Sequence, residues 1–255
     1  MMYYPLIETD PNCVPYLSGS YIDSFCQDLV RRFDPDVIEK GHPLNIERFI
    51  TDYLGLNLEF ESLSCDLSIL GATVFSDTDE FPVYDVRLNE AVYRSAKEGT
   101  VFVENELCRR GLGNRYRFTL AHEAGHAIWH GLYYKTLSRA QRNQISHLSC
   151  TNKNTKLSHR DPAPGRLNSI QLMEYQANRS ANSLLMPAEA VRRLMAGRGE
   201  CLTRDEAEDR IIMTASVFRV SDAAARYRLE QLSLIEKPRR KIITAKELLA
   251  RCAAI

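Results

Sequence analysis

Three histidines and one glutamate lie close together in the stretch RFTLAHEAGHAIWHG, which covers positions 117 to 131. If this stretch is helical, His122 and His126 project from nearly the same face, because a helix turns about 100° per residue. Both imidazoles can then reach one zinc ion at about 2.0–2.1 Å. Glu123 lies beside the metal, where it can take a proton from a water molecule. The spacing is that of the His-Glu-x-x-His motif of metalloproteases, and it predicts a metal site with Glu123 as the catalytic base.

The alternative for these residues is a pair of hydrogen-bonded core histidines beside an exposed glutamate. The apolar neighbours of the motif favour a packed helix, and Gly125 would allow a neighbouring segment to approach closely. His130 extends the spacing, but it lies ~12 Å along the helix axis from His122. One ion cannot bind both, so we interpret His130 as a helix-end residue or as a hydrogen-bond partner of a ligand.

A catalytic zinc ion needs a third protein ligand, and no residue directly after the motif is placed to supply it. The next long helical pattern, at 167–187, contains Glu174 within its apolar stripe. A carboxylate buried there requires a cation or strong donors. The spacing leaves two alternatives: Glu174 is the third ligand, or it pairs with Arg117 or Arg179. Asn178, one turn later, is either an ordinary packing amide or an acceptor for the N–H of a ligand histidine.

Several elements must position these residues, and we expect an α+β fold. A small mixed β-sheet packs on the helix that carries the motif, and a mainly helical C-terminal part follows. Periodicity and turn residues predict helices at 18–33, 43–55, 114–130, 167–187, 188–197, 203–218 and 220–235, and strands at 56–63, 69–77, 81–86 and 100–107.

The same patterns divide the chain into segments. We predict a central domain at 43–235 that carries the motif, with an N-terminal extension at 1–42 before it and a basic C-terminal tail at 236–255 after it. Within the domain we expect the sheet and motif helix at 43–134, a basic polar loop at 135–166 and a helical subdomain at 167–235.

Composition agrees with an ordinary globular enzyme. Hydrophobic residues make up 44% of the chain and charged residues 26%, and formal net charge is zero. No apolar run approaches the ~18 residues of a membrane span, and the start of the chain lacks the pattern of a secretory signal. Seven cysteines occur without a Cys-x-x-Cys pair, which favours a reducing compartment. We therefore expect a cytoplasmic protein with no membrane partner.

Three motifs in order, RYRFTLAHEAGHAIWH, MEYQANRSANSLLMP and ASVFRVSDAAARYRLEQLSLI, resemble the ImmA/IrrE family of zinc metallopeptidases over about residues 43–235. The resemblance implies a gluzincin-type site with one Zn²⁺ ion, or another divalent metal, on His122, His126 and Glu174, and with Glu123 as base. It also implies a protein substrate, a helix-turn-helix (XRE-like) repressor that the enzyme cleaves or inactivates in a mobile-element, phage or stress-response circuit. The N-terminal extension, the long connection and the basic tail depart from the family pattern.

Two other functions stay open. Segment 213–233 has a helix-turn-helix pattern with Ser221 as N-cap, and Arg226 and Arg228 on its second helix could contact DNA. We favour a helical pair that packs on the catalytic core with its arginines solvated, because alanines and a leucine dominate that helix. The chain could also be a zinc-bound sensor without turnover.

A peptidase also needs a donor to the oxyanion. Tyr133, Tyr134, Tyr175 and His159 are possible donors, and the sequence does not choose among them.

Overall fold

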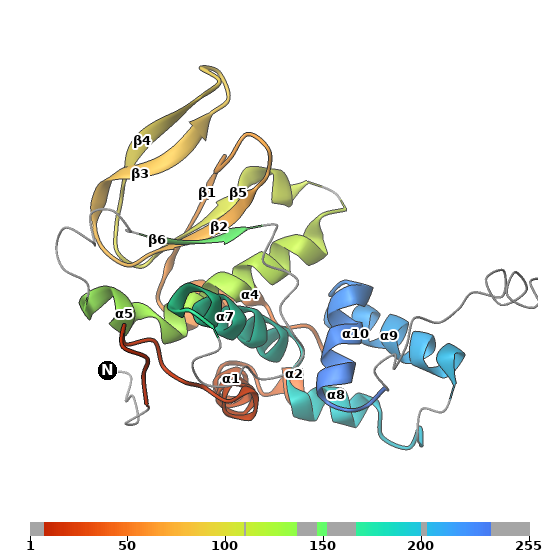
Figure 1. Ribbon diagram of the computed structural model, residues 1–255. Helices are drawn as coiled ribbons and strands as arrows, with labels where there is room; N and C mark the ends of the chain where they lie inside the picture. Colours follow the sequence, from red (N-terminus) through yellow and green to blue (C-terminus); the bar gives the residue numbers. More distant parts are fainter. Residues whose placement is uncertain (1–7, 110, 137–146, 152–166, 200–202, 236–255) are drawn as a thin grey trace, which may run out of the picture.

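Two long helices, α4 (Gly113–Trp129) and α7 (Ser169–Leu185), pack against each other at the centre of the molecule (Figure 1). A Cβ atom on Gly125 would lie 3.0 Å from the Cα of Ala177 and 3.0 Å from the Cβ of Ser180. A side chain at this position would push against the backbone of α7, so glycine favours the close approach of the two helices, as the sequence predicted. The computed structural model describes residues 8–109, 111–136, 147–151, 167–199 and 203–235.

The main sheet lies over α4 in the strand order β1-β5-β2-β6 (Figure 1). β1 runs parallel to β5, whereas β2 runs antiparallel to both β5 and β6, so the sheet is mixed. β2 packs directly on α4, and all but its first residue are buried. The strands span Asn57–Glu61 (β1), Ile69–Val74 (β2), Thr100–Glu104 (β5) and His147–Thr151 (β6).

A separate antiparallel hairpin, β3 (Thr78–Asp85) and β4 (Glu90–Ala96), extends away from the main sheet (Figure 1). It packs on the sheet through the stacked rings of Phe81 and Phe102, whose centroids are 4.3 Å apart. β4 was not predicted, because most of its side chains are exposed or half-buried and its apolar pattern is weak.

The N-terminal part contributes a helix that packs against α7. Helix α1 (Gly19–Phe33) begins at Ser18, whose side chain accepts a hydrogen bond from the N–H of Tyr21. The single helix predicted at 43–55 is replaced by a short helical turn and a π-helical segment. These connecting elements span Asp36–Glu39 (α2), Ile46–Arg48 (α3), Phe49–Tyr53 (η1) and, after β5, Asn105–Cys108 (η2).

The C-terminal helices form a layer beside the α4–α7 pair (Figure 1). A capping box at Thr203 starts α9, and Arg219 ends it in the left-handed conformation, with φ at 51°. Ser221 then caps α10, as predicted, by accepting from the N–H of Ala224 at 3.2 Å. The helices span Ala188–Leu194 (α8), Arg204–Phe218 (α9) and Asp222–Gln231 (α10).

The predicted α+β class, with a small mixed sheet on the motif helix and a helical C-terminal part, is confirmed. The connection predicted as a basic polar loop at 135–166 is partly regular, because it contains the end of α5 (Gly131–Thr136) and all of β6. The rest of the predicted basic loop, at 137–146 and 152–166, and the tail at 236–255 lie outside the described residues. Among the described helices, none is long and apolar enough to cross a membrane.

Candidate metal centre

His122, His126 and Glu174 form a buried cluster where α4 meets α7. The two histidine Nε2 atoms are 2.9 Å apart. The Glu174 carboxylate places Oε2 3.5 Å from Nε2 of His122 and Oε1 3.4 Å from Nε2 of His126. Ligand atoms around a tetrahedral ion with bonds of about 2.0–2.1 Å are separated by roughly 3.3 Å. The three donors therefore converge as ligands do, and the cluster could hold a metal ion.

The ring of His122 is oriented by Asn178. The amide Nδ2 of Asn178 donates to the backbone carbonyl of Glu174 at 2.9 Å, which turns its Oδ1 toward His122. That oxygen lies 3.3 Å from His122 Nδ1 and can only accept, so Nδ1 carries the proton. In a neutral imidazole the other nitrogen, Nε2, then has a free lone pair that faces the cluster.

The ring of His126 is oriented by a longer chain of hydrogen bonds. Its Nδ1 lies 2.9 Å from Nδ1 of His130, and Nε2 of His130 lies 2.9 Å from Oε1 of Gln176. The amide Nε2 of Gln176 donates to the carbonyl oxygen of Pro15. Because a carbonyl only accepts, every proton in this chain is assigned: Gln176 Oε1 accepts from His130, and His130 accepts from His126. His126 Nε2 is therefore also a bare lone pair.

The histidines of the cluster are held in the neutral form. Burial lowers the pKa of His122 to about 4, with a further contribution from His126, and it lowers the pKa of His126 to about 3. Burial also lowers the pKa of His130 well below its usual value. Two unprotonated ring nitrogens thus face each other at 2.9 Å beside a carboxylate. Such an arrangement is stabilised by a cation among the three groups, so the donor set fits a divalent metal.

Glu123 points from α4 toward strand β2. Its Oε2 accepts a hydrogen bond of 2.6 Å from the hydroxyl of Thr73, which also donates to the Glu123 backbone carbonyl at 3.2 Å. Gly71, two residues earlier on β2, makes room for this side chain. A Cβ there would lie 2.7 Å from Cγ2 of Thr119 and 2.9 Å from Oε1 of Glu123. The sheet therefore fixes where the glutamate adjacent to the metal donors lies.

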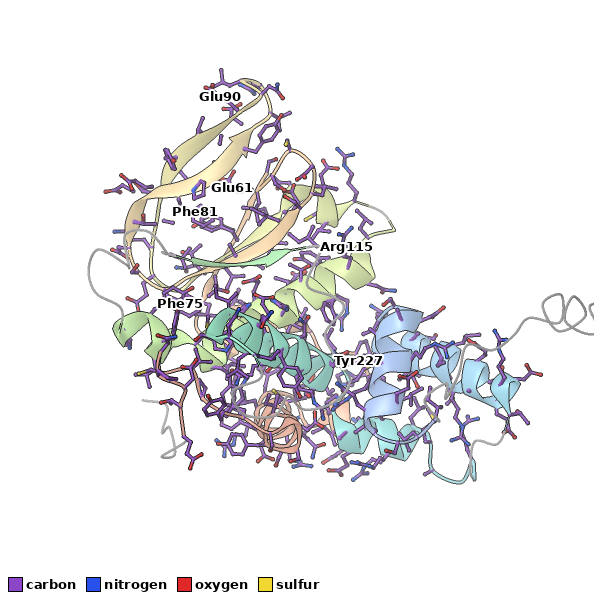
Figure 2. All side chains as sticks on the ribbon, in the orientation of Figure 1. Glu61, Phe75, Phe81, Glu90, Arg115 and Tyr227 are labelled. Atoms are coloured by element: carbon purple, nitrogen blue, oxygen red, sulfur yellow. The ribbon has the colours of Figure 1, made fainter. Side chains whose placement is uncertain are left out.

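Of the four candidate oxyanion donors, Tyr134 of α5 has the environment that suits the role best. Its ring stacks on Phe75, with centroids 4.3 Å apart, where the chain leaves β2 (Figure 2). Burial raises the pKa of its hydroxyl, and the nearby side chains of Tyr133, Glu123 and Glu174 raise it further. Within the described part of the chain, the buried Oη has no hydrogen-bond partner. A buried hydroxyl in that condition is available to a substrate oxygen.

The other residues proposed from the sequence are placed differently. Tyr133 and Tyr175 are both buried, and His159 lies outside the described residues. Arg179 forms an ion pair of 2.6 Å with Asp23 of α1. Arg117 donates to three backbone carbonyl oxygens, those of Leu44, Phe218 and Arg219. The arginines offered as alternatives to a metal beside Glu174 thus have partners of their own.

The arginines of α10 do not form a basic face. Arg228 is completely buried, and its guanidinium donates to Asp23 at 2.7 Å and to the Met186 carbonyl at 2.9 Å. Arg226 pairs with Glu208 of α9 at 2.6 Å. The geometry favours a helical pair that packs on the core. The prediction that both arginines of this helical pair are solvated is wrong for Arg228, which is completely buried.

A cavity of about 530 Å³ opens beside the metal donors, where α4, α7 and α10 meet. Arg115 and Tyr227, which Figure 2 labels on either side of this junction, both line it. Phe118 lines it one turn before His122, and Asn178 both lines it and contacts His122. No acidic residue belongs to its described lining. The cavity therefore adjoins the cluster through Asn178, and none of the three donors is among its described lining residues.

Sequence reasoning missed three contributors to the site: Thr73, Gly71 and the Gln176–Pro15 contact. Each depends on tertiary contact with a distant segment, and none has a local pattern. A glycine inside a strand pattern is the one available signal, because it often marks a close backbone or side-chain approach.

Comparison with protein families gives one match. Residues 113–230 match the model of the IrrE N-terminal-like domain, peptidase family M78. The matched segment contains α4, α7 and all three donors of the cluster. No curated protein matches the chain.

Proposed function

We propose that the chain is a zinc-dependent endopeptidase of the ImmA/IrrE family, because residues 113–230 match the model of the IrrE N-terminal-like domain. The observation that carries the proposal is the convergence of two unprotonated imidazole nitrogens and one carboxylate in a buried cluster. Two histidines and a glutamate are a ligand set of catalytic zinc sites, which leave one position open for water or substrate.

In the proposed mechanism His122, His126 and Glu174 hold the ion. When bound, zinc supplies a Lewis acid that polarises a peptide carbonyl and lowers the pKa of water toward ~7. Glu123 takes the proton of the attacking water at its carboxylate and delivers it to the amide nitrogen as the C–N bond breaks. The hydroxyl of Thr73 donates to Glu123 Oε2 and so keeps this carboxylate on the sheet side of the site.

The negative charge that develops on the carbonyl oxygen needs a donor. We assign this role to Tyr134, because its buried hydroxyl has no other hydrogen-bond partner in the described structure. The charges of Glu123 and Glu174 also raise the pKa of this hydroxyl, so it keeps the proton that it donates. The hydroxyl can donate its proton in a hydrogen bond to the oxyanion without losing an existing interaction.

The cavity beside His122 suits one side chain of an extended substrate. One helical turn, ~5.4 Å, separates Phe118 from His122, and an extended peptide advances about 3.3 Å per residue. The cavity therefore lies within about two residues of the bond to be cleaved. Its walls include Phe118, Ala223 and Tyr227 together with Arg115 and no acid, which favours a large uncharged side chain over a basic one.

We propose that the substrate is a helix-turn-helix (XRE-like) repressor and that the reaction occurs in the cytoplasm. The substrate follows from the resemblance of the three sequence motifs to the ImmA/IrrE peptidases. The described cysteine side chains Cys13, Cys26, Cys65 and Cys108 are free thiols, which agrees with a reducing compartment.

The test is incubation with the repressor-like protein encoded beside this gene, with and without a chelator. We expect zinc-dependent cleavage that the chelator stops, and no cleavage by the Glu123→Gln variant although it still binds zinc. Full activity of Glu123→Gln would contradict its assignment as base. A zinc-loaded wild type that cleaves nothing would favour the sensor function instead.

A further inference from the structure

The hydrogen bonds that link His126 to His130 and Gln176 each have a donor and an acceptor. A residue distant in the sequence, Pro15, decides which group donates in each of them. We propose that His130 and Gln176 are positioning residues for His126, and that the carbonyl oxygen of Pro15 fixes which nitrogen of His126 carries the proton. The chain of contacts runs from Pro15 through Gln176 and His130 to His126. This inference depends on the metal assignment within the proposed function.

The same heavy atoms support a second arrangement. If the Gln176 amide turns over, its N–H group donates to Nε2 of His130, and Nδ1 of His130 then donates to Nδ1 of His126. His126 must then carry its proton on Nε2, the atom that faces His122 and Glu174. All contacts among these three side chains are kept, but the metal-binding lone pair of His126 is lost.

Pro15 selects between the two arrangements. Its carbonyl only accepts, so it requires the N–H side of the Gln176 amide. In the turned-over arrangement, two carbonyl oxygens would face each other in the interior without a proton between them. The backbone of residue 15 thus keeps the relay in the form that leaves His126 Nε2 free.

Pro15 is held in place by a segment that packs on the start of α7. Val14 is completely buried in a cluster with Tyr134 and Met173. Asp10 Oδ2 accepts a hydrogen bond of 2.5 Å from the hydroxyl of Ser169 at the first residue of α7. The segment lies outside the family-matched residues 113–230, so it is a contribution of this chain to the metal centre.

The test measures zinc affinity by competition with a chromophoric chelator, in the full chain. Gln176→Met removes the relay, and Val14→Asp places a charge in the apolar cluster and so displaces residue 15. Both should weaken zinc binding by about 10–100-fold, the usual effect of losing a partner of a ligand histidine. Val86→Asp is the matched control, since Val86 is 69% exposed, and it should bind zinc as the wild type does.

A double variant distinguishes control of the His126 proton from a general loss of structure in the single variant. In Val14→Asp/Gln176→Glu the carboxylate can only accept from His130, which restores the metal-competent arrangement without Pro15. We expect its zinc affinity to return to within about threefold of the wild type, because the ligand proton again sits on Nδ1. A merely structural role for the segment predicts no such recovery.

Nitrogen-15 NMR of the histidines in metal-free protein gives an independent readout. The wild type should carry the His126 proton on Nδ1, and Val14→Asp should move it toward Nε2. The proposal is overturned by a wild-type proton on Nε2, by unchanged zinc affinity in Gln176→Met or Val14→Asp, or by a double variant no better than Val14→Asp. A wild type that binds no zinc contradicts the metal assignment itself, and zinc binding without peptide cleavage contradicts only the proposed endopeptidase activity.

Discussion

Asp23 of α1 is a carboxylate held between two buried arginines, and its removal should destabilise the whole domain. Arg179 of α7 and Arg228 of α10 contact it at 2.6 Å and 2.7 Å, and Ser183 also donates to it. The side chains are 13%, 9% and 0% exposed for Asp23, Arg179 and Arg228. Asp23→Asn keeps the shape of the group but removes its charge, and it deprives both guanidinium groups of this carboxylate.

Breaking a buried ion pair from one side costs about 3–5 kcal/mol. We expect a loss in this range for Asp23→Asn, because Arg228 has no access to water. For a domain of this size each kcal/mol lowers Tm by about 2–4 °C, so Tm should fall by roughly 6–20 °C. Asp28→Asn, on the same helix, removes an exposed pair with Arg31 and should change stability by less than about 1 kcal/mol.

Urea unfolding of the two variants measures this difference, and pH adds a second check. Burial works to raise the pKa of Asp23, but Arg228, Arg179 and the hydrogen bonds from Arg179 and Ser183 lower it below 3.8. A folded-state pKa below the unfolded one means that this stability is present above pH ~4 and is lost as pH falls further. Below pH ~4 the free energy of unfolding should therefore fall less steeply with pH in Asp23→Asn than in the wild type. A variant within 1 kcal/mol of wild type, with an unchanged acid profile, would refute the reasoning.

Four further results are expected. Tyr134→Phe should lower kcat by about 10²–10³-fold with little change in KM, as for loss of one oxyanion donor; an unchanged kcat would remove the tyrosine from the mechanism. Gly71→Ala should destabilise the protein by about 1–3 kcal/mol through overpacking and reduce turnover, which thermal unfolding and peptidase assays measure. Ala223→Phe should fill the cavity and raise KM, whereas Ala91→Phe on the exposed hairpin should not. The metal-free protein should lose stability as pH falls from 6.5 toward about 4, because the buried imidazoles of the cluster bind protons only when unfolded; a flat profile there would contradict their burial as neutral rings.

The sequence predicted the elements that carry strong periodicity and could not predict those that depend on distant partners. Helix α4 was expected at 114–130 and lies at Gly113–Trp129, because its apolar residues recur at helical spacing and its motif is local. Strand β6 was missed within a polar connection. It is added to the sheet by pairing with β2, and its own residues give little indication of that pairing.

The candidate site divides in the same way. The spacing of His122 and His126 followed from helix geometry alone, whereas spacing left Glu174 undecided until the family resemblance was considered. The spacing offered His130 as a possible partner of a ligand. The part played by Gln176 and the direction of these hydrogen bonds could not be derived, because they depend on which carbonyl of a segment some 160 positions away meets the Gln176 amide. Tertiary contacts of that kind leave no periodic signal in a single sequence.

The placement of the three donors on two helices means that neither helix can hold the ion by itself. His122 and His126 precede the connection at 137–166 and Glu174 follows it, while Gly125 keeps the helices in close contact. A backbone cut within that connection would yield two polypeptides, each with an incomplete donor set. Zinc would then join the fragments much as a cross-link does, and bound metal would report that the two halves of the domain have reassembled.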